Sequence, residues 1–127
     1  MKRGDIWTVA GGKDYAGKAR PVVILGDDSF DGTESITICA LTTDDTDAPL
    51  FRLAVEPNER NGLRIPCHLM VDKVTTVPKS KLGAHIGRLD DEDILRLNRA
   101  VLVFLGPATS PGSKKARAVT RRIFLIA

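Results

Sequence analysis

The chain has 127 residues, of which 43% are hydrophobic and 28% are charged, which is typical of one soluble globular domain. No stretch reaches the roughly 18 consecutive apolar residues of a transmembrane helix, and no apolar signal-peptide core follows the N-terminal "MKRGDIW". We therefore expect a cytoplasmic protein without a membrane contact.

The net charge of +3 is unevenly distributed. Residues 107–127 carry five of the 19 Lys and Arg residues and no acid, so residues 1–106 hold 14 basic and 16 acidic side chains. The overall charge is thus no argument for a nucleic-acid partner. We predict a domain of residues 1–106 and a basic, flexible tail of residues 107–127. The tail could also contact nucleic acid, or dock its terminal "IFLIA" on a partner or a sheet edge.

Short apolar runs separated by Gly, Asp, Asn and Pro clusters predict strands throughout the first 89 residues. In chain order they are Asp5–Val9, Pro21–Leu25, Ser35–Thr42, Leu50–Val55, Cys67–Lys73 and His85–Leu89. The stretch "PKSKLG" before the last strand predicts a helical turn ended by glycine. Residues 56–66 predict a long polar loop.

One helix follows the strands. Asp90 or Asp91 caps it, its first turn is acidic, and Gly106 ends it before a proline. Apolar residues at helical spacing predict a buried stripe: Ile94, Leu97, Val101, Leu102 and Leu105. Short strands followed by one packed helix predict a mainly β, α+β fold, a small half-open barrel.

Arg20 is a charged side chain at the entry of the apolar run Val22 to Leu25. Pro21 restrains the residue before it to extended backbone, which limits the directions that Arg20 can take. A planar guanidinium matches phosphate oxygens bidentately, so Arg20 suits a phosphate at the end of a strand. A surface arginine paired with a nearby acid is the alternative interpretation.

Four motifs occur in a common order: "MKRGDIW", "GKARPVVIL", "CALTT" and "VDKVTTVPKSKLG". Together they resemble the MazF/PemK/Kid family of toxin endoribonucleases from bacterial toxin–antitoxin systems, over residues 1–106. The resemblance implies an SH3-like half-open β-barrel with a C-terminal helix (CcdB/MazF-like) and a homodimer. It also implies cleavage of single-stranded RNA without metal or other cofactor, and a cognate MazE-like antitoxin through which operator DNA is bound.

RNA cleavage without metal can use the 2′-OH as nucleophile, which leaves a 2′,3′-cyclic phosphate and a 5′-OH end. It needs a group for the 2′ proton, a group for the leaving oxygen, and donors for the phosphorane. The resemblance implies Arg20 and Thr42 as catalytic partners and Thr43 as an RNA contact. Because arginine stays protonated in proteins, charge stabilisation is the expected role of Arg20.

Asp72 corresponds to the proposed general base of Kid-like members. Those members carry an arginine two residues earlier, where this chain has Met70, and a histidine in the first loop, where it has "KDYAGK". Asp72 is therefore either a catalytic base or a structural partner of Arg20.

The loop between the first two strands supplies Lys13, Tyr15 and Lys18. Two cations and an aromatic ring suit RNA phosphates and a stacked base. A solvated loop without function is the alternative.

The remaining candidates for chemistry are expected to be structural. Cys39 and Cys67 lie in apolar strand segments as buried free thiols, and no residues have metal-ligand spacing. His68 and His85 match no catalytic position of the family, and Trp7 belongs to the core or a dimer interface.

Two other functions fit the same fold. A CcdB-like toxin would bind DNA gyrase without hydrolysis, but this chain lacks the Trp-Gly-Ile-like ending of such proteins. A non-catalytic nucleic-acid-binding barrel is the second, and the joint presence of Arg20, Thr42 and Asp72 argues against it.

Overall fold

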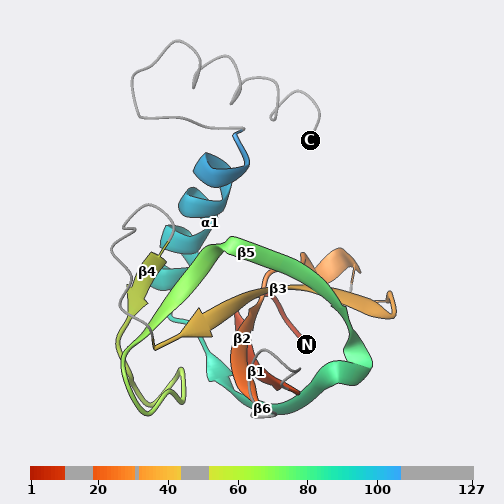
Figure 1. The fold of residues 1–127 in the computed structure, drawn as a ribbon, viewed down its shortest axis with the longest axis horizontal. Coiled ribbons are helices and arrows are strands. Elements are labelled where there is room, and N and C mark those ends of the chain that lie inside the picture. Colours follow the sequence, from red (N-terminus) through yellow and green to blue (C-terminus); the bar gives the residue numbers. More distant parts are fainter. Residues whose placement is uncertain (11–18, 31, 44–51, 107–127) are drawn as a thin grey trace.

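The computed structural model describes residues 1–10, 19–30, 32–43 and 52–106 (Figure 1). In this part of the chain six strands form one antiparallel sheet in the order β4-β5-β3-β2-β1-β6. The strands are β1 (Asp5–Val9), β2 (Arg20–Ile24), β3 (Ser35–Thr42), β4 (Arg52–Val55), β5 (Cys67–Pro78) and β6 (Leu82–Arg88). Two 3₁₀ turns, η2 (Asp28–Phe30) and η3 (Lys79–Lys81), and the helix α1 (Asp91–Leu105) complete the elements.

The predicted strands and helix are all present. β1, β3 and α1 have the predicted bounds, and the other four strands differ. β5 continues to Pro78, although the sequence predicted its end at Lys73, because its second half pairs with β3 from Ser35 to Cys39. β6 begins at Leu82 and not at His85, because it pairs along β1. The turn predicted in "PKSKLG" is η3, and the residue that follows it is Leu82, not glycine.

The sheet curls without closing, as the predicted half-open barrel requires (Figure 1). The register between β3 and β5 shifts between Cys39 and Leu41, and such an irregularity bends a strand. The end of β5 then passes through η3 into β6, which lies at the opposite edge of the sheet. The curled sheet therefore pairs β1, near the N-terminus, with β6, the last strand before α1.

Both faces of the sheet bury apolar residues. The first cluster lies on the α1 face and includes Val23, Leu41, Leu69 and Val71, with Leu97 of α1 packed among them. The second cluster lies on the other face and consists of Val22, Ile24, Ile36 and Ile38, with Trp7 packed against it. Successive residues of a regular strand point to opposite faces, which is why Val22 and Val23 of β2 belong to different clusters.

The predicted buried stripe of α1 is only partly correct. Leu97 is buried, and Ile94 and Val101 pack against the first cluster. Leu102 and Leu105 are 42% and 64% exposed, contrary to the prediction. The reason is the position of the helix, because α1 packs on β4 and β5 and its last turns extend beyond the sheet (Figure 1).

Both cysteines are free and buried, as predicted. Burial, together with the nearby carboxylate of Asp72, raises the pKa of Cys39 to about 12, while Arg52 opposes the shift. Burial also raises the pKa of Cys67. Both thiols are therefore protonated at neutral pH and neither is a nucleophile.

Candidate active site on the face opposite the helix

Arg20 opens β2 on the face of the sheet that carries the second cluster. It shares this face with Val22 and Ile24, and it lies opposite Val9 of β1. Pro21 occupies the second position of the strand, where it pairs with Thr8. The predicted extended entry of Arg20 is therefore confirmed, and two buried neighbours anchor the strand behind it.

Thr42 ends β3, the strand next to β2. β2 pairs with β3 as far as Val22 and Ala40, which are two residues from Arg20 and from Thr42. Alternation puts Arg20 on the face of Val22 and Thr42 on the face of Ala40, and paired residues share a face. The two residues that the motifs suggested thus lie on adjacent strands and on one face of the sheet. Thr43 follows the strand and is exposed.

His68 of β5 lies directly opposite Thr42, and Ala54 of β4 lies opposite His68 on the far side. His68 therefore faces the same side of the sheet as Arg20 and Thr42. These three residues lie on the adjacent strands β5, β2 and β3 and form a row across the sheet. The sequence analysis expected a structural histidine. Alternation with the buried Cys67 and Leu69 indicated the face on which His68 lies, but the neighbouring strand was unknown.

Asp72 pairs with Arg52, a residue that the sequence analysis missed. Arg52 Nε lies 3.2 Å from Asp72 Oδ1, and Arg52 Nη2 donates a hydrogen bond of 3.3 Å to Asp72 Oδ2. Arg52 lies opposite Met70, so its guanidinium occupies the sheet face next to the position where Kid-like toxins carry an arginine. The Arg52 and Asp72 side chains are 12% and 29% exposed.

A pocket of about 270 Å³ lies on the same face, and its charged lining residues are Arg20 and Lys73. The other lining residues are mostly apolar: Val9, Ala10, Val22, Ile38, Ala40, Val74, Thr75 and Val77. Apolar walls accept a planar ring, while the two cations suit the phosphate attached to it. Lys73 is a second site residue that the sequence analysis missed.

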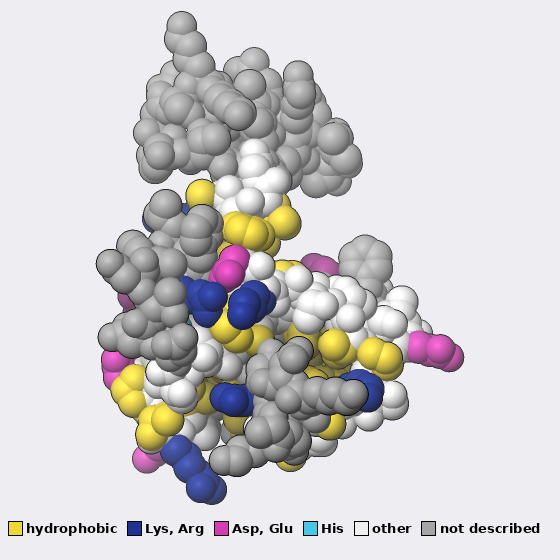
Figure 2. All heavy atoms as spheres, viewed as in Figure 1, with side chains coloured by type: hydrophobic (Ala, Val, Ile, Leu, Met, Phe, Trp, Pro, Cys, Tyr) yellow, Lys and Arg dark blue, Asp and Glu magenta, His cyan; other side chains and the backbone are white. Residues whose placement is uncertain are grey.

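On the face of the molecule that Figure 2 shows, the basic side chains are dispersed. Figure 2 shows Lys and Arg side chains at several separate places among hydrophobic ones. Lys13, Tyr15 and Lys18, which were predicted to contact RNA, lie outside the described residues, as does the tail of residues 107–127.

No group of three His, Cys, Asp or Glu side chains among the described residues could hold a metal ion. No helix in this part of the chain is long and apolar enough to cross a membrane.

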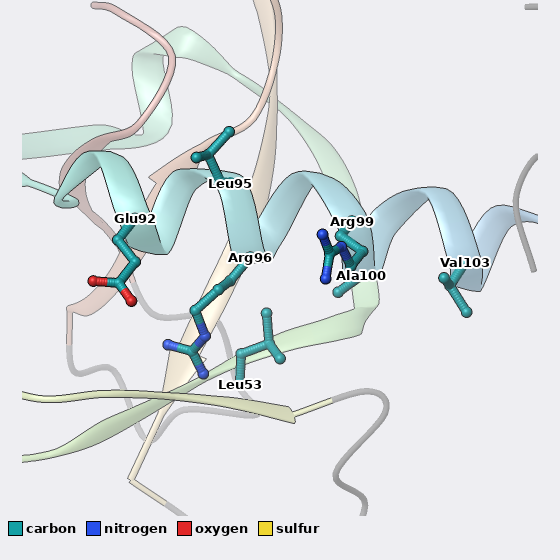
Figure 3. A pocket seen from close by; sticks show the side chains of 7 residues that line it. All are labelled: Leu53, Glu92, Leu95, Arg96, Arg99, Ala100 and Val103. Atoms are coloured by element: carbon teal, nitrogen blue, oxygen red, sulfur yellow. The ribbon is translucent and has the colours of Figure 1, made fainter. Parts of the chain in front are cut away.

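A second hollow, of about 380 Å³, lies between α1 and β4 (Figure 3). Its lining residues are Leu53, Glu92, Leu95, Arg96, Arg99, Ala100 and Val103. Leu53 packs against the first cluster, so this hollow lies on the other face of the sheet from Arg20. It is therefore separate from the candidate active site.

A half-open β-barrel with one C-terminal helix, and a row of arginine, hydroxyl and imidazole groups across its strands, define a small protein suited to act on a phosphodiester. The model of the PemK-like, MazF-like toxins of type II toxin–antitoxin systems matches residues 2–105. The chain belongs to this family.

Similar proteins agree with this assignment. The chain is 54% identical over 108 residues to a Mycolicibacterium smegmatis protein named "Probable endoribonuclease MazF", covering 85% of this chain and 99% of the relative. The solved structure of the Mycobacterium tuberculosis toxin MazF-mt6 matches with a TM-score of 0.65 and 27% identity, covering 77% of this chain and 92% of that one. A mycobacterial endoribonuclease in complex with its cognate antitoxin shares the fold, with a TM-score of 0.70 and 22% identity over 84% of this chain and 95% of that one.

Proposed function

We propose that this chain is the toxin of a type II toxin–antitoxin pair, a sequence-specific endoribonuclease that cleaves single-stranded RNA without metal. The observation that carries the proposal is the row of Arg20, Thr42 and His68 on adjacent strands. The 54% identity to a MazF named as an endoribonuclease supports the same activity. Family membership favours this function over a CcdB-like, gyrase-binding one.

The proposed reaction is an internal transesterification. The 2′-OH attacks the phosphorus, the bond from phosphorus to the 5′ oxygen breaks, and the products are a 2′,3′-cyclic phosphate and a 5′-OH end. Arg20 stabilises the charge of the phosphorane, and Thr42 orients the reacting oxygens. The 2′ proton leaves to a base and the 5′ oxygen gains a proton, and His68, which lies opposite Thr42, is a site group able to exchange one.

Purified protein is expected to cut a long single-stranded RNA in excess EDTA at the same rate as with added Mg²⁺. The reason is that protein donors alone supply the charge stabilisation in the proposed reaction. The measurement is gel analysis of a transcript, with the new ends tested for phosphorylation by a kinase, which requires a 5′-OH. Cleavage that depends on Mg²⁺, or products with 5′-phosphate ends, would contradict the mechanism.

Lys13, Tyr15, Lys18 and Thr43 are proposed to contact the RNA strand, and residues 1–106 to form the toxin domain with 107–127 as an appended tail. The toxin acts in the cytoplasm, where mRNA is its substrate. A MazE-like antitoxin binds and inhibits it, and operator DNA is reached through that antitoxin.

The toxin is proposed to form a homodimer through the exposed apolar side of α1. Leu95 is 67% exposed and Val103 is 40% exposed, and both line the hollow of Figure 3. Such a patch on one helix is typical of an interaction surface.

The double variant Leu95→Glu and Val103→Glu is expected to be monomeric, because two charges in an apolar interface lose their hydration. Light scattering after size exclusion should give twice the 13.8 kDa chain mass for the wild type and a single chain mass for the variant. The control is Ile65→Glu, at a 54% exposed residue of the loop before β5, which should stay dimeric. An unchanged mass for the double variant would place the interface elsewhere.

A further inference from the structure

We infer that Arg52 is a second RNA-binding cation of the site and that Asp72 is its positioning residue, not a catalytic base. The inference rests on the proposed endoribonuclease function. It assigns Arg52 to a phosphate next to the scissile one, on the same RNA strand that Arg20 holds.

Arg52 lies on the face of the sheet that carries Thr42 and His68. Ala54 lies opposite His68, and Arg52 is two residues before Ala54 on the same strand, so both face the side that carries Thr42 and His68. In the sheet, β5 and β3 lie between β4 and β2. Arg52 on β4 and Arg20 on β2 therefore lie on opposite sides of the Thr42–His68 pair.

Arg20 and Arg52 lie too far apart across the sheet to hold the same phosphate. Three strand spacings of about 4.8 Å lie between β2 and β4. An RNA strand held by Arg20 at the scissile phosphate therefore extends past Thr42 and His68 before it reaches Arg52. We accordingly assign Arg52 to substrate binding and Arg20 to the reacting phosphate.

The carboxylate of Asp72 holds one edge of the Arg52 guanidinium. Asp72 faces the Nε and Nη2 edge of Arg52, with one oxygen near each nitrogen. A guanidinium has five N–H donors, and Asp72 accepts a hydrogen bond from one of them, on Nη2, while Nε lies in ion-pair contact only. The Arg52 side chain is 12% exposed, and the inferred phosphate contact uses this exposed part.

The contacts of Asp72 are those of a residue that orients Arg52. Both of its oxygens face one guanidinium, which is the geometry of an orienting partner. Asp72 also lies within the irregular stretch of β5 between Leu69 and Val74, and strand irregularities near active sites redirect side chains.

The test is a double-mutant cycle with Arg52→Met, Asp72→Asn and the combined variant. Arg52→Met should raise KM about 10- to 100-fold with little change in kcat, as for loss of a charge-assisted hydrogen bond. Asp72→Asn should raise KM less, and should add nothing in the Arg52→Met background. A general base at Asp72 would instead lower kcat, remove the acidic limb of the pH–rate profile, and act equally in both backgrounds.

Binding gives a readout that a purely structural role would not change. Affinity for an RNA that is 2′-O-methylated throughout, and therefore not cleavable, is measured by fluorescence anisotropy at increasing salt. Arg52→Met should reduce the slope of log affinity against log salt by about 0.7, the value for one phosphate contact with a single strand. Arg52→Lys should restore the slope because it keeps the charge.

The matched control is the exposed pair formed by Arg60 and Asp91, whose Nη2 and Oδ1 lie 3.6 Å apart. Arg60→Met and Asp91→Asn should leave KM and the salt slope unchanged. Thermal unfolding checks that each variant folds, and Arg52→Gln replaces Arg52→Met should the latter fail. An unchanged slope and KM in the folded Arg52 variant, or an undiminished effect of Asp72→Asn in its background, overturns the inference.

Failure of the proposed endoribonuclease function can be distinguished from failure of the inference about Arg52. It would show as a wild type that cleaves no RNA, and the salt slopes of the binding cycle then still decide the role of Arg52. Cleavage by the wild type combined with an unchanged Arg52→Met leaves the proposed function intact and rejects the inference alone.

Discussion

Arg20→Ala is expected to abolish RNA cleavage, with kcat/KM falling by about 10³-fold or more, as for loss of a main donor to a developing oxyanion. Arg20 lines the pocket of the candidate site and lies on the same face of the sheet as Thr42, so its guanidinium is available to the phosphate that is proposed to react. The buried Val22 and Ile24 on the same face hold β2 in place behind it. Initial rates on a fluorescent RNA containing the cleavage site measure the loss.

The control for this result is Arg20→Lys, which keeps the charge and loses the planar fork. It should retain more activity than Arg20→Ala and less than the wild type, because lysine binds phosphate as a point charge. Neither variant should lower the midpoint of thermal unfolding markedly, since the strand is anchored by its apolar neighbours. More than about a tenth of wild-type activity in Arg20→Ala would remove Arg20 from the reacting phosphate.

The candidate site was predictable from the sequence where it depends on local patterns. Arg20 was indicated by the proline that follows it, and Thr42 by the resemblance of the motif "CALTT" to the toxin family. Alternation along β5 also assigned His68 and Asp72 to one face. These features depend on short stretches of chain, and the structure reproduces them.

The partners of these residues were not predictable, because they depend on the order of strands in the sheet. One sequence does not show that β5 lies between β3 and β4, and this order places His68 beside Thr42 and Arg52 beside Asp72. The exposed Leu102 and Leu105 were missed for a similar reason. Their spacing predicts a buried face, but the sheet ends before the helix does.

The loop of residues 56–66 connects β4, which carries Arg52, to β5, which carries His68. The sequence analysis found only a polar loop there. In the structure the loop is built around Asn61, whose side chain is fully buried. Asn61 Oδ1 accepts hydrogen bonds from the backbone N–H of Asn58 and of Leu63, each at 3.0 Å, and Asn61 Nδ2 donates to the carbonyl of Glu56 at 2.8 Å.

The loop is also packed tightly against β6. The backbone of Arg88 donates to the carbonyl of Arg60 at 2.9 Å. A Cβ at Gly87 would meet the carbonyl of Asn61, and a Cβ at Gly62, whose φ is +69°, would meet the carbonyl of Ile86. The loop therefore has little freedom to rearrange when one of its hydrogen bonds is lost.

Asn61→Ala is therefore expected to lower the free energy of unfolding by about 3 kcal/mol, roughly 1 kcal/mol for each of three hydrogen bonds lost inside the protein. Urea unfolding followed by circular dichroism measures the change. Asn98→Ala is the matched control, since the buried Asn98 Oδ1 has no hydrogen-bond partner among the described residues, and it should cost less than about 1 kcal/mol. Equal losses in the two variants would show that the network around Asn61 contributes nothing specific. A larger loss in Asn61→Ala, together with a raised KM for RNA, would show that this loop keeps β4 and Arg52 in register with the rest of the site.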